Sequence, residues 1–259
     1  MLVCYLHPAT EIQHAFAVSL MGLVNHDAAN LGRLFTSTGP LMMRCGTGGL
    51  VDARNSAVAH FLDRSVEEWL WFVDTDMGFQ PDTVDRLVEA ADPVERPVMG
   101  ALCFGMKQGD SDGFGGYLTA PFPTIYGWHQ GPDGHAGFKG ATGYPRDTVV
   151  KVAGTGAACL LIHRTAAEKV RAEHGDTWFD QVRYPNGQLV SEDLSFCYRL
   201  GLLEIPVHVH TGVRTTHAKT VWVGEREFLA HQALNEMAAA AAQRAARLEV
   251  EEAPADAAS

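Results

Sequence analysis

The sequence predicts an α/β protein in which helices flank a mostly parallel central sheet, and two observations predict this fold class. Through the first half of the chain, apolar strand-like runs alternate with segments of helical period, an order typical of parallel sheets covered on both faces. Residues 69–73 are continuously apolar and rich in aromatic and β-branched side chains, as expected of a strand buried on both faces. A smaller sheet and loop region is expected in the second half.

The individual strands and helices are predicted from the spacing of apolar residues and from turn-forming residues. Strands are expected at residues 2–6, 31–36, 69–73, 97–104, 149–152, 157–162 and 205–210. Helices are expected at residues 11–24 with Thr10 as N-cap, from residue 52, at 82–90 with Pro81 in the first turn, and at 165–173, 190–200 and 224–252. Residues 108–146 show little period and predict loops on the scaffold. The cluster Gly46 to Gly49 lacks a P-loop lysine and is interpreted as a flexible connection.

Composition limits the function classes. The chain has 259 residues, of which 46% are hydrophobic and 20% charged, and one globular domain is expected. A net charge of −11 disfavours a generally basic nucleic-acid surface, although a local basic face would still allow DNA binding. The candidates for such a face are Arg146, Lys151, Arg183, Arg214 and Lys219. Five dispersed cysteines without a CxxC motif predict reduced thiols and a cytoplasmic location, and neither a signal peptide nor a membrane span is expected.

Two carboxylates follow the strand at 69–73. Asp74 and Asp76 stand at its carboxyl end, where open α/β sheets bind ligands. Two acids this close repel each other, so a hard divalent cation that carries a phosphate group is an economical explanation of the pair. The alternative is a solvated turn in which both acids cap the next helix.

Three further sets of polar residues are candidates for a site. Arg54 and Asn55 fall near the start of a helix, where they could hold an anion or a base edge, or could form an ordinary exposed first turn. Glu192 and Asp193 lie at the positive end of another helix, where capping alone would explain them. His217 is either a surface residue or a metal ligand.

Taken in chain order, these residues resemble the GT-A fold of nucleotide-sugar glycosyltransferases, most closely the family 2 type and its small, often phage-encoded relatives. The resemblance covers roughly residues 1–222. It rests on Arg54-Asn55, Asp74-Thr75-Asp76, Lys107, Gly154-Thr155-Gly156, Glu192-Asp193 and His217. It implies a Rossmann-like catalytic domain at 1–225, with a nucleotide-binding half at 1–107 and an acceptor-binding half at 108–225. A C-terminal helix at 226–252 and a disordered tail at 253–259 would follow.

The resemblance also implies roles for individual residues. Mn²⁺ or Mg²⁺ would be held by Asp74, Asp76 and His217. The nucleotide sugar would be bound by His7, Pro8, Glu11, Arg54, Asn55, Asp74 and Lys107. The acidic pair Glu192 and Asp193 would be catalytic, with Asp193 as general base toward the acceptor if the enzyme inverts configuration. The late histidine is expected to converge in space with the two aspartates.

The expected function is metal-dependent transfer of a sugar from a nucleoside diphosphate sugar to an acceptor hydroxyl. The sequence leaves four kinds of acceptor as alternatives: a modified DNA base of a phage, a saccharide, a lipid-linked molecule and a protein. A phage-encoded enzyme would act in the host cytoplasm. One alternative is a nucleotidyltransferase acting on a sugar phosphate, in which the glycine-rich loop would clasp a triphosphate. Another is a relative that binds nucleotide or carbohydrate without turnover.

Overall fold

A computed structural model describes residues 1–7, 12–30, 32, 34, 41–111, 113, 117–131, 136–141, 143–184, 186–221 and 223–252. The chain divides into two compact units. The first comprises Met1–Lys107 and Ala120–Lys219, and the second comprises Gln108–Thr119 and Thr220–Ser259. The central sheet and every predicted site residue that the structure describes belong to the first unit.

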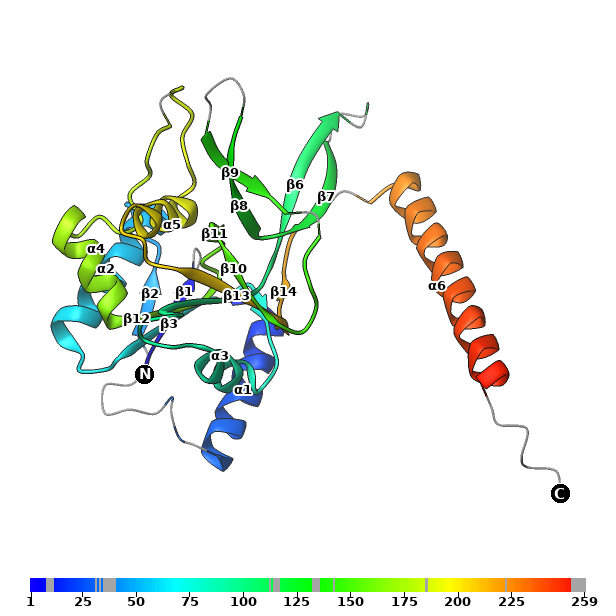
Figure 1. Ribbon diagram of the computed structural model, residues 1–259, viewed down its shortest axis with the longest axis horizontal. Helices are drawn as coiled ribbons and strands as arrows, with labels where there is room; N and C mark the ends of the chain where they lie inside the picture. The colour runs from blue at the N-terminus through cyan, green and yellow to red at the C-terminus, as the bar shows by residue number, and fades with distance from the viewer. Residues whose placement is uncertain are drawn as a thin grey trace. The chain divides into compact units, whose positions relative to one another are not determined.

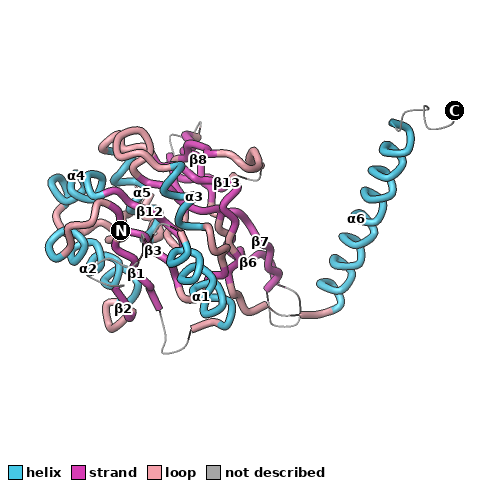
Figure 2. The backbone as a smooth tube through the Cα atoms, turned by 90° about the horizontal axis from the view of Figure 1, so that it is seen from below, coloured by secondary structure: helices cyan, strands magenta, loops and turns pink. Residues whose placement is uncertain are grey.

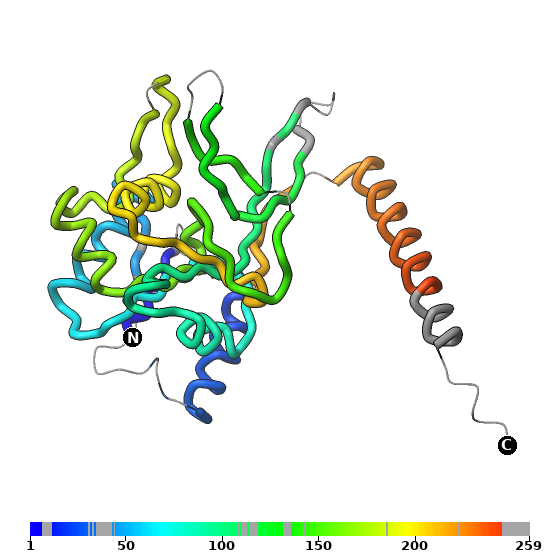
Figure 3. The backbone as a smooth tube through the Cα atoms, viewed as in Figure 1, coloured from blue at the N-terminus to red at the C-terminus, as the bar shows by residue number. Residues whose placement is uncertain are grey.

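A mixed sheet of seven strands forms the centre of the first unit (Figure 1). Its strand order is β10 (Val149–Val152), β13 (Val207–Arg214), β5 (Val98–Leu102), β12 (Cys159–His163), β3 (Trp69–Asp74), β1 (Leu2–His7) and β2 (Leu41–Arg44). The pairs β1–β2, β1–β3 and β5–β13 are parallel, whereas β12 is antiparallel to β3 and β5, and β10 to β13. The α/β class is therefore confirmed, but the sheet is mixed because two strands run against the other five. Figure 3 shows by colour how early and late strands interleave.

Helices cover both faces of this sheet, as expected (Figure 2). Successive side chains of β3 point to opposite faces of the sheet. Leu70 and Phe72 pack into one apolar cluster, and Trp71 and Val73 pack into another. The first cluster includes side chains of α2 (Gly49–Arg64), α4 (Arg164–His174) and α5 (Glu192–Leu202). The second includes side chains of α1 (His14–Ala29) and α3 (Thr83–Ala90).

Strands also occupy much of the region 108–146 that the sequence predicts as loops. β8 (Ile125–Gln130) and β9 (Ala136–Gly140) form a three-stranded sheet with β11 (Gly154–Thr155), and β6 (Phe104–Ser111) pairs with β7 (Tyr117–Pro123). The expected smaller sheet of the second half is therefore present, but residues 108–146 were wrongly predicted as loops because these strands lie at the surface. In β8 only the first residue is buried, so no apolar alternation marks it.

Several expected boundaries also shift. Most of 31–36 lies outside the described residues, and the second strand is β2 at Leu41–Arg44. Helix α1 begins at His14 with Gln13 as N-cap, while Thr10 is outside the described residues. Helix α2 begins at Gly49, earlier than residue 52, and the Asp52 side chain folds back over the N-cap Gly48, where only a glycine leaves room. Pro81 precedes the N-cap of α3.

The second unit contains α6 (Glu225–Glu252), as the sequence predicts, and residues 253–259 lie outside the described residues. Phe228, Leu229, Leu234 and Met237 of α6 are exposed. None of the described helices combines the length and the apolar character that crossing a membrane requires. All five cysteines are free thiols, and only Cys45 is not fully buried.

Arg164 locks the carboxyl end of α2 to the start of α4. Its guanidinium donates hydrogen bonds of 2.7 to 3.2 Å to the carbonyls of Phe61, Leu62, Ser65 and Glu67, and it lies 4.6 Å from the centre of the Phe61 ring. The last carbonyls of a helix have no partner within the helix, so this single cation satisfies several of them. The position of α2 is thereby fixed, and α2 carries Arg54.

We expect the free energy of unfolding to fall as the pH is lowered from 7.5 to 5.5. Burial lowers the pKa of His163, His208 and His210 in the folded protein, so in this window the unfolded chain binds more protons. His163 also accepts a hydrogen bond from the backbone N–H of Thr165 as the N-cap of α4, which requires an unprotonated ring nitrogen. Urea unfolding of His163→Asn, which keeps a cap, should show a weaker pH dependence, whereas the exposed control His129→Asn should match the wild type.

Candidate functional site

A cavity of about 550 Å³, here called the acidic cavity, opens in the first unit where β1 and β3 end. The starts of α2 and α5 and the segment before β12 complete its wall. It is lined by Leu6, Cys45, Gly46, Gly49, Leu50, Arg54, Asp74, Asp76, Cys103, Gly105, Thr124, Gly156, Ala157, Ala158, Glu192, Asp193, His217 and Lys219. Four carboxylates and three basic side chains thus meet at the end of the sheet, where α/β folds bind ligands.

Arg54 joins two of the carboxylates. It projects from α2, is 2% exposed, and donates from Nη1 to Glu192 at 2.6 Å and from Nη2 to Asp74 at 3.3 Å. Burial lowers the pKa of Arg54, but the charges of Asp74, Glu192 and Asp193 outweigh burial and hold the pKa above its ordinary value. Arg54 is therefore a permanent cation, and its Nε has no hydrogen-bond partner among the described residues.

Asp76 faces a different set of partners. β4 (Met77–Gly78) pairs with β14 (Thr216–His217), and this ladder places Nε2 of His217 3.0 Å from Oδ2 of Asp76. Nδ1 of His217 lies 2.9 Å from the carbonyl of Phe104, which can only accept, so the ring donates at this nitrogen. Lys219 also reaches Oδ2 of Asp76, at 3.4 Å. The expected convergence of Asp76 with the late histidine is confirmed.

The two aspartates differ in electrostatic environment. Burial raises the pKa of Asp74, and the attraction of Arg54 offsets this only in part. Burial also raises the pKa of Asp76, but there the hydrogen bonds and charges of His217 and Lys219 outweigh it, so the pKa lies below its usual value. Oδ1 of Asp74 is buried without a hydrogen-bond partner in the described structure. Asp76 is thus the stronger anion, and Asp74 retains one unused oxygen.

The acids at the start of α5 also have separate partners. Glu192 accepts the bond from Arg54. Oδ1 of Asp193 accepts from the hydroxyl of Ser191 and, at 2.8 Å, from the backbone N–H of Leu194. Oδ2 of Asp193 lies beside Gly156, 3.6 Å from where a β-carbon would stand. Glu192 therefore belongs to the Arg54 ion pair, while the Asp193 carboxylate is presented to the cavity.

The structure brings together six of the residues to which the resemblance assigns a catalytic, nucleotide-binding or metal-binding role: Arg54, Asp74, Asp76, Glu192, Asp193 and His217. Two others lie outside the cavity lining. Asn55 accepts from the backbone N–H of Phe179 and donates to Asp180 at 2.6 Å, so it tethers the segment before α5. Lys107 is exposed on β6. The backbone of His7 ends β1, its side chain lies outside the described structure, and so do Pro8 and Glu11.

Sequence reasoning missed some cavity residues. Gly46 and Gly49, interpreted as part of a flexible connection, line the cavity at the start of α2. Lys219, which the sequence analysis considers only for a DNA-binding face, reaches Asp76. A glycine-rich loop that leads into a helix was the available signal for the first two. Lys219 is two positions after His217, so both side chains can point to the same side of an extended segment.

The five basic residues considered for a DNA-binding face do not gather around this cavity. Lys219 lines it, but Lys151 lines another hollow and Arg214 pairs with Asp147 at 2.6 Å beside a third. Arg183 donates to the carbonyl of Gly187, and Arg146 is exposed. Among the described residues, the five basic side chains considered for DNA binding therefore do not form a common face at the acidic cavity.

Within the described part of the chain, no group of three or more His, Cys, Asp or Glu side chains is arranged to hold a metal ion. Neither a protein-family model nor a curated protein matches the sequence. Among solved structures, A197 from STIV is similar with a TM-score of 0.43 and 14% sequence identity, over 85% of this chain and 87% of that one.

We expect Arg54→Met to lower the free energy of unfolding by about 3–5 kcal/mol, because it leaves two partly buried carboxylates without their buried cation. Urea unfolding followed by tryptophan fluorescence measures the loss. The control Arg214→Met breaks an exposed ion pair and should cost at most about 1 kcal/mol. Adding Asp74→Asn to Arg54→Met should restore part of the stability. Equal effects of Arg54→Met and Arg214→Met would contradict the role assigned to the buried pair.

Proposed function

We propose that this protein is a metal-dependent glycosyltransferase with a GT-A-type fold, which moves a sugar from a nucleoside diphosphate sugar to an acceptor hydroxyl. The observation that carries the proposal is the contact between Asp76 and His217 in the acidic cavity, across 141 residues of sequence. A capped turn after β3 does not require a distant histidine. A site for a divalent cation would account for the pair, because carboxylate oxygen and imidazole nitrogen are common metal ligands.

The chemistry of this pair fits a divalent cation. The Nδ1–H of His217 is donated to the carbonyl of Phe104, which is the outer contact that orients metal-binding histidines, and Nε2, which faces Asp76, would ligate the cation after giving up its proton. Asp76 and His217 would hold Mn²⁺ or Mg²⁺, and Asp74 can add its unused oxygen or reach the ribose. Two or three protein ligands suffice where phosphate oxygens and water complete the coordination. Bound there, the cation supplies charge neutralisation for a departing diphosphate.

The basic residues of the cavity support binding of the same diphosphate. Lys219 has a flexible side chain and lies on Asp76, so it can turn to a phosphate that arrives beside that carboxylate. Arg54 is held between Asp74 and Glu192, which fixes its orientation at the cavity wall. These two cations would stabilise the negative charge that grows on the leaving group.

Asp193 is the residue proposed to act on the acceptor. It stands at the positive end of α5 in the cavity wall, and Ser191 and Leu194 hold one of its oxygens. The other oxygen can accept the proton of an acceptor hydroxyl as the bond to the sugar forms. Glu192 is bound to Arg54 and would position the cavity wall without taking the proton.

A second candidate function is nucleotidyl transfer to a sugar phosphate. It is favoured by Gly46 and Gly49, because a glycine-rich loop at the start of α2 lines the cavity and could surround a triphosphate. Intact-mass analysis of the acceptor product distinguishes the two. A gain of one sugar from a nucleoside diphosphate sugar supports glycosyl transfer, whereas a gain of one nucleoside monophosphate from a triphosphate supports the second candidate.

Asp76→Asn and His217→Asn should each abolish the stabilisation that Mn²⁺ adds to a bound nucleoside diphosphate. A thermal-shift panel of nucleoside diphosphates with and without Mn²⁺ measures this, because a ligand that binds only the folded state raises Tm. Asp147→Asn makes the same chemical change at an exposed site and should behave as the wild type. Full metal-dependent stabilisation in Asp76→Asn would refute the assigned metal site, provided that circular dichroism shows the variants folded.

Asp193→Asn should lower the rate of sugar transfer by about 10²–10⁴-fold, the usual contribution of a general base. Donor binding should be unchanged, because Asp193 faces the acceptor side. Single-turnover transfer assays give the rate, and the metal-dependent thermal shift gives donor binding. If transfer and donor binding fell together, Asp193 would be a residue that maintains the cavity and not the base.

A further inference from the structure

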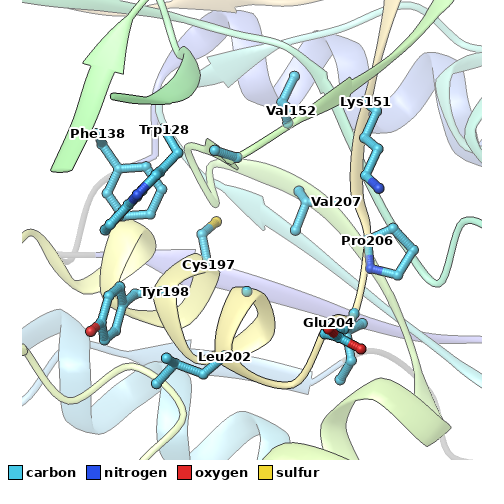
Figure 4. A pocket seen from close by; sticks show the side chains of 13 residues that line it. Trp128, Phe138, Lys151, Val152, Cys197, Tyr198, Leu202, Glu204, Pro206 and Val207 are labelled. Atoms are coloured by element: carbon cyan, nitrogen blue, oxygen red, sulfur yellow. The ribbon is translucent and has the colours of Figure 1, made fainter. Parts of the chain in front are cut away.

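A second hollow of about 670 Å³, here called the apolar pocket, lies in the first unit and shares no lining residue with the acidic cavity. It is bounded by the carboxyl-terminal half of α5, by strands β8 and β9, and by β10 with the start of β13 (Figure 4). Its lining residues are Trp128, Phe138, Lys151, Val152, Ala153, Cys197, Tyr198, Gly201, Leu202, Glu204, Ile205, Pro206 and Val207. Its volume is in the range of small-molecule sites.

The walls are apolar except at one end. Aromatic side chains form one side, and the only charged members, Lys151 and Glu204, lie on the opposite side with Pro206 between them (Figure 4). Trp128 is 48% exposed and Leu202 is 59% exposed, although both are large and apolar. Large apolar side chains left in water around a concave surface are typical of a ligand site.

The aromatic side of the pocket is preorganised. The Trp128 ring is held edge-on by Phe138 at 5.2 Å and by Tyr184 at 6.4 Å between ring centres. Tyr198 lies 5.8 Å from Trp128, with the two ring planes only 34° apart. These contacts hold the indole in place before any ligand arrives, so a flat or hydrocarbon group could pack on it with little loss of side-chain freedom.

The pocket is suited to binding and not to catalysis. Figure 4 shows the sulfur of Cys197 pointing into the hollow, but burial raises the pKa of this thiol to about 12, so it stays protonated and unreactive. A bare sugar would leave most of its hydroxyl groups without partners against these walls. An apolar body with a polar end matches the arrangement, because the lysine and the glutamate at one end provide one donor and one acceptor group.

We propose that the apolar pocket binds a small molecule with an aromatic or hydrocarbon body, whose polar end lies between Lys151 and Glu204. The proposal does not depend on the function proposed for the acidic cavity. The two hollows do share α5, because Glu192 and Asp193 at its first turn line the acidic cavity and its last two turns line the apolar pocket.

Gly201 provides the test. A β-carbon at this position meets no atom within 4 Å, and a larger residue in α5 is a better helix former than glycine, so Gly201→Leu fills the pocket without disturbing the fold. Gly127 on β8 has equally open surroundings and does not line the pocket, so Gly127→Leu is the matched control. The probe is N-phenyl-1-naphthylamine, which is uncharged, aromatic and fluorescent in apolar surroundings.

The full-length wild type should bind one probe molecule per chain in a saturable fluorescence titration. Gly201→Leu should weaken this binding at least tenfold, and Gly127→Leu should leave it unchanged. Equal binding by wild type and Gly201→Leu would overturn the proposal, since the probe would then occupy another apolar surface such as the exposed side chains of α6. Absence of saturable binding to the wild type would also overturn it. Asp76→Asn should bind the probe normally, which separates this result from failure of the proposed transferase function.

Discussion

The buried guanidinium of Arg54 is the interaction on which the acidic cavity depends. Removing a cation from water is costly unless charge partners and hydrogen bonds replace the lost hydration. Here the partners come from two other elements, Asp74 at the end of β3 and Glu192 at the start of α5, so one side chain holds three elements together. The two aspartates after β3 therefore have different partners. Asp74 mainly balances the charge of Arg54, and Asp76 contacts His217 and Lys219.

Much of the architecture could be predicted from local pattern, and the failures have identifiable causes. β3 and α4 were predictable because buried strands and helices have distinct apolar periods. The direction of β12 was not, because an apolar run buried on both faces has the same pattern whichever way the strand runs. β8 and β9 were missed because surface strands need no apolar alternation. Because β12 is antiparallel to its neighbours, its amino end and not its carboxyl end lies at the acidic cavity. Ala157 and Ala158, which precede β12, therefore line the cavity.

The part of the candidate site that could be predicted is the part in which residue type and chain order form a pattern, and contacts that depend only on spatial neighbours could not be predicted. Asp76 and His217 were expected to meet, and they do. Asn55 shows the limit, because a short polar residue near a helix start can face a ligand or tether a neighbouring segment, and the partner that decides is Phe179, far along the chain. Gly46 and Gly49 show the same limit of prediction, because the packing of α2, and not the composition of the loop, determines which residues the loop contacts.

The pairing of β4 with β14 determines at which stage of synthesis and folding the acidic cavity can be completed. It brings together two segments separated by 141 residues, and contacts of such separation form only after the loop-closure entropy of the intervening chain has been overcome. During synthesis, a nascent chain that has emerged only as far as α5 already carries Arg54, both aspartates and the acids of α5, but it lacks the histidine. The Asp76–His217 contact therefore belongs to the completed fold, and a chain released early lacks it.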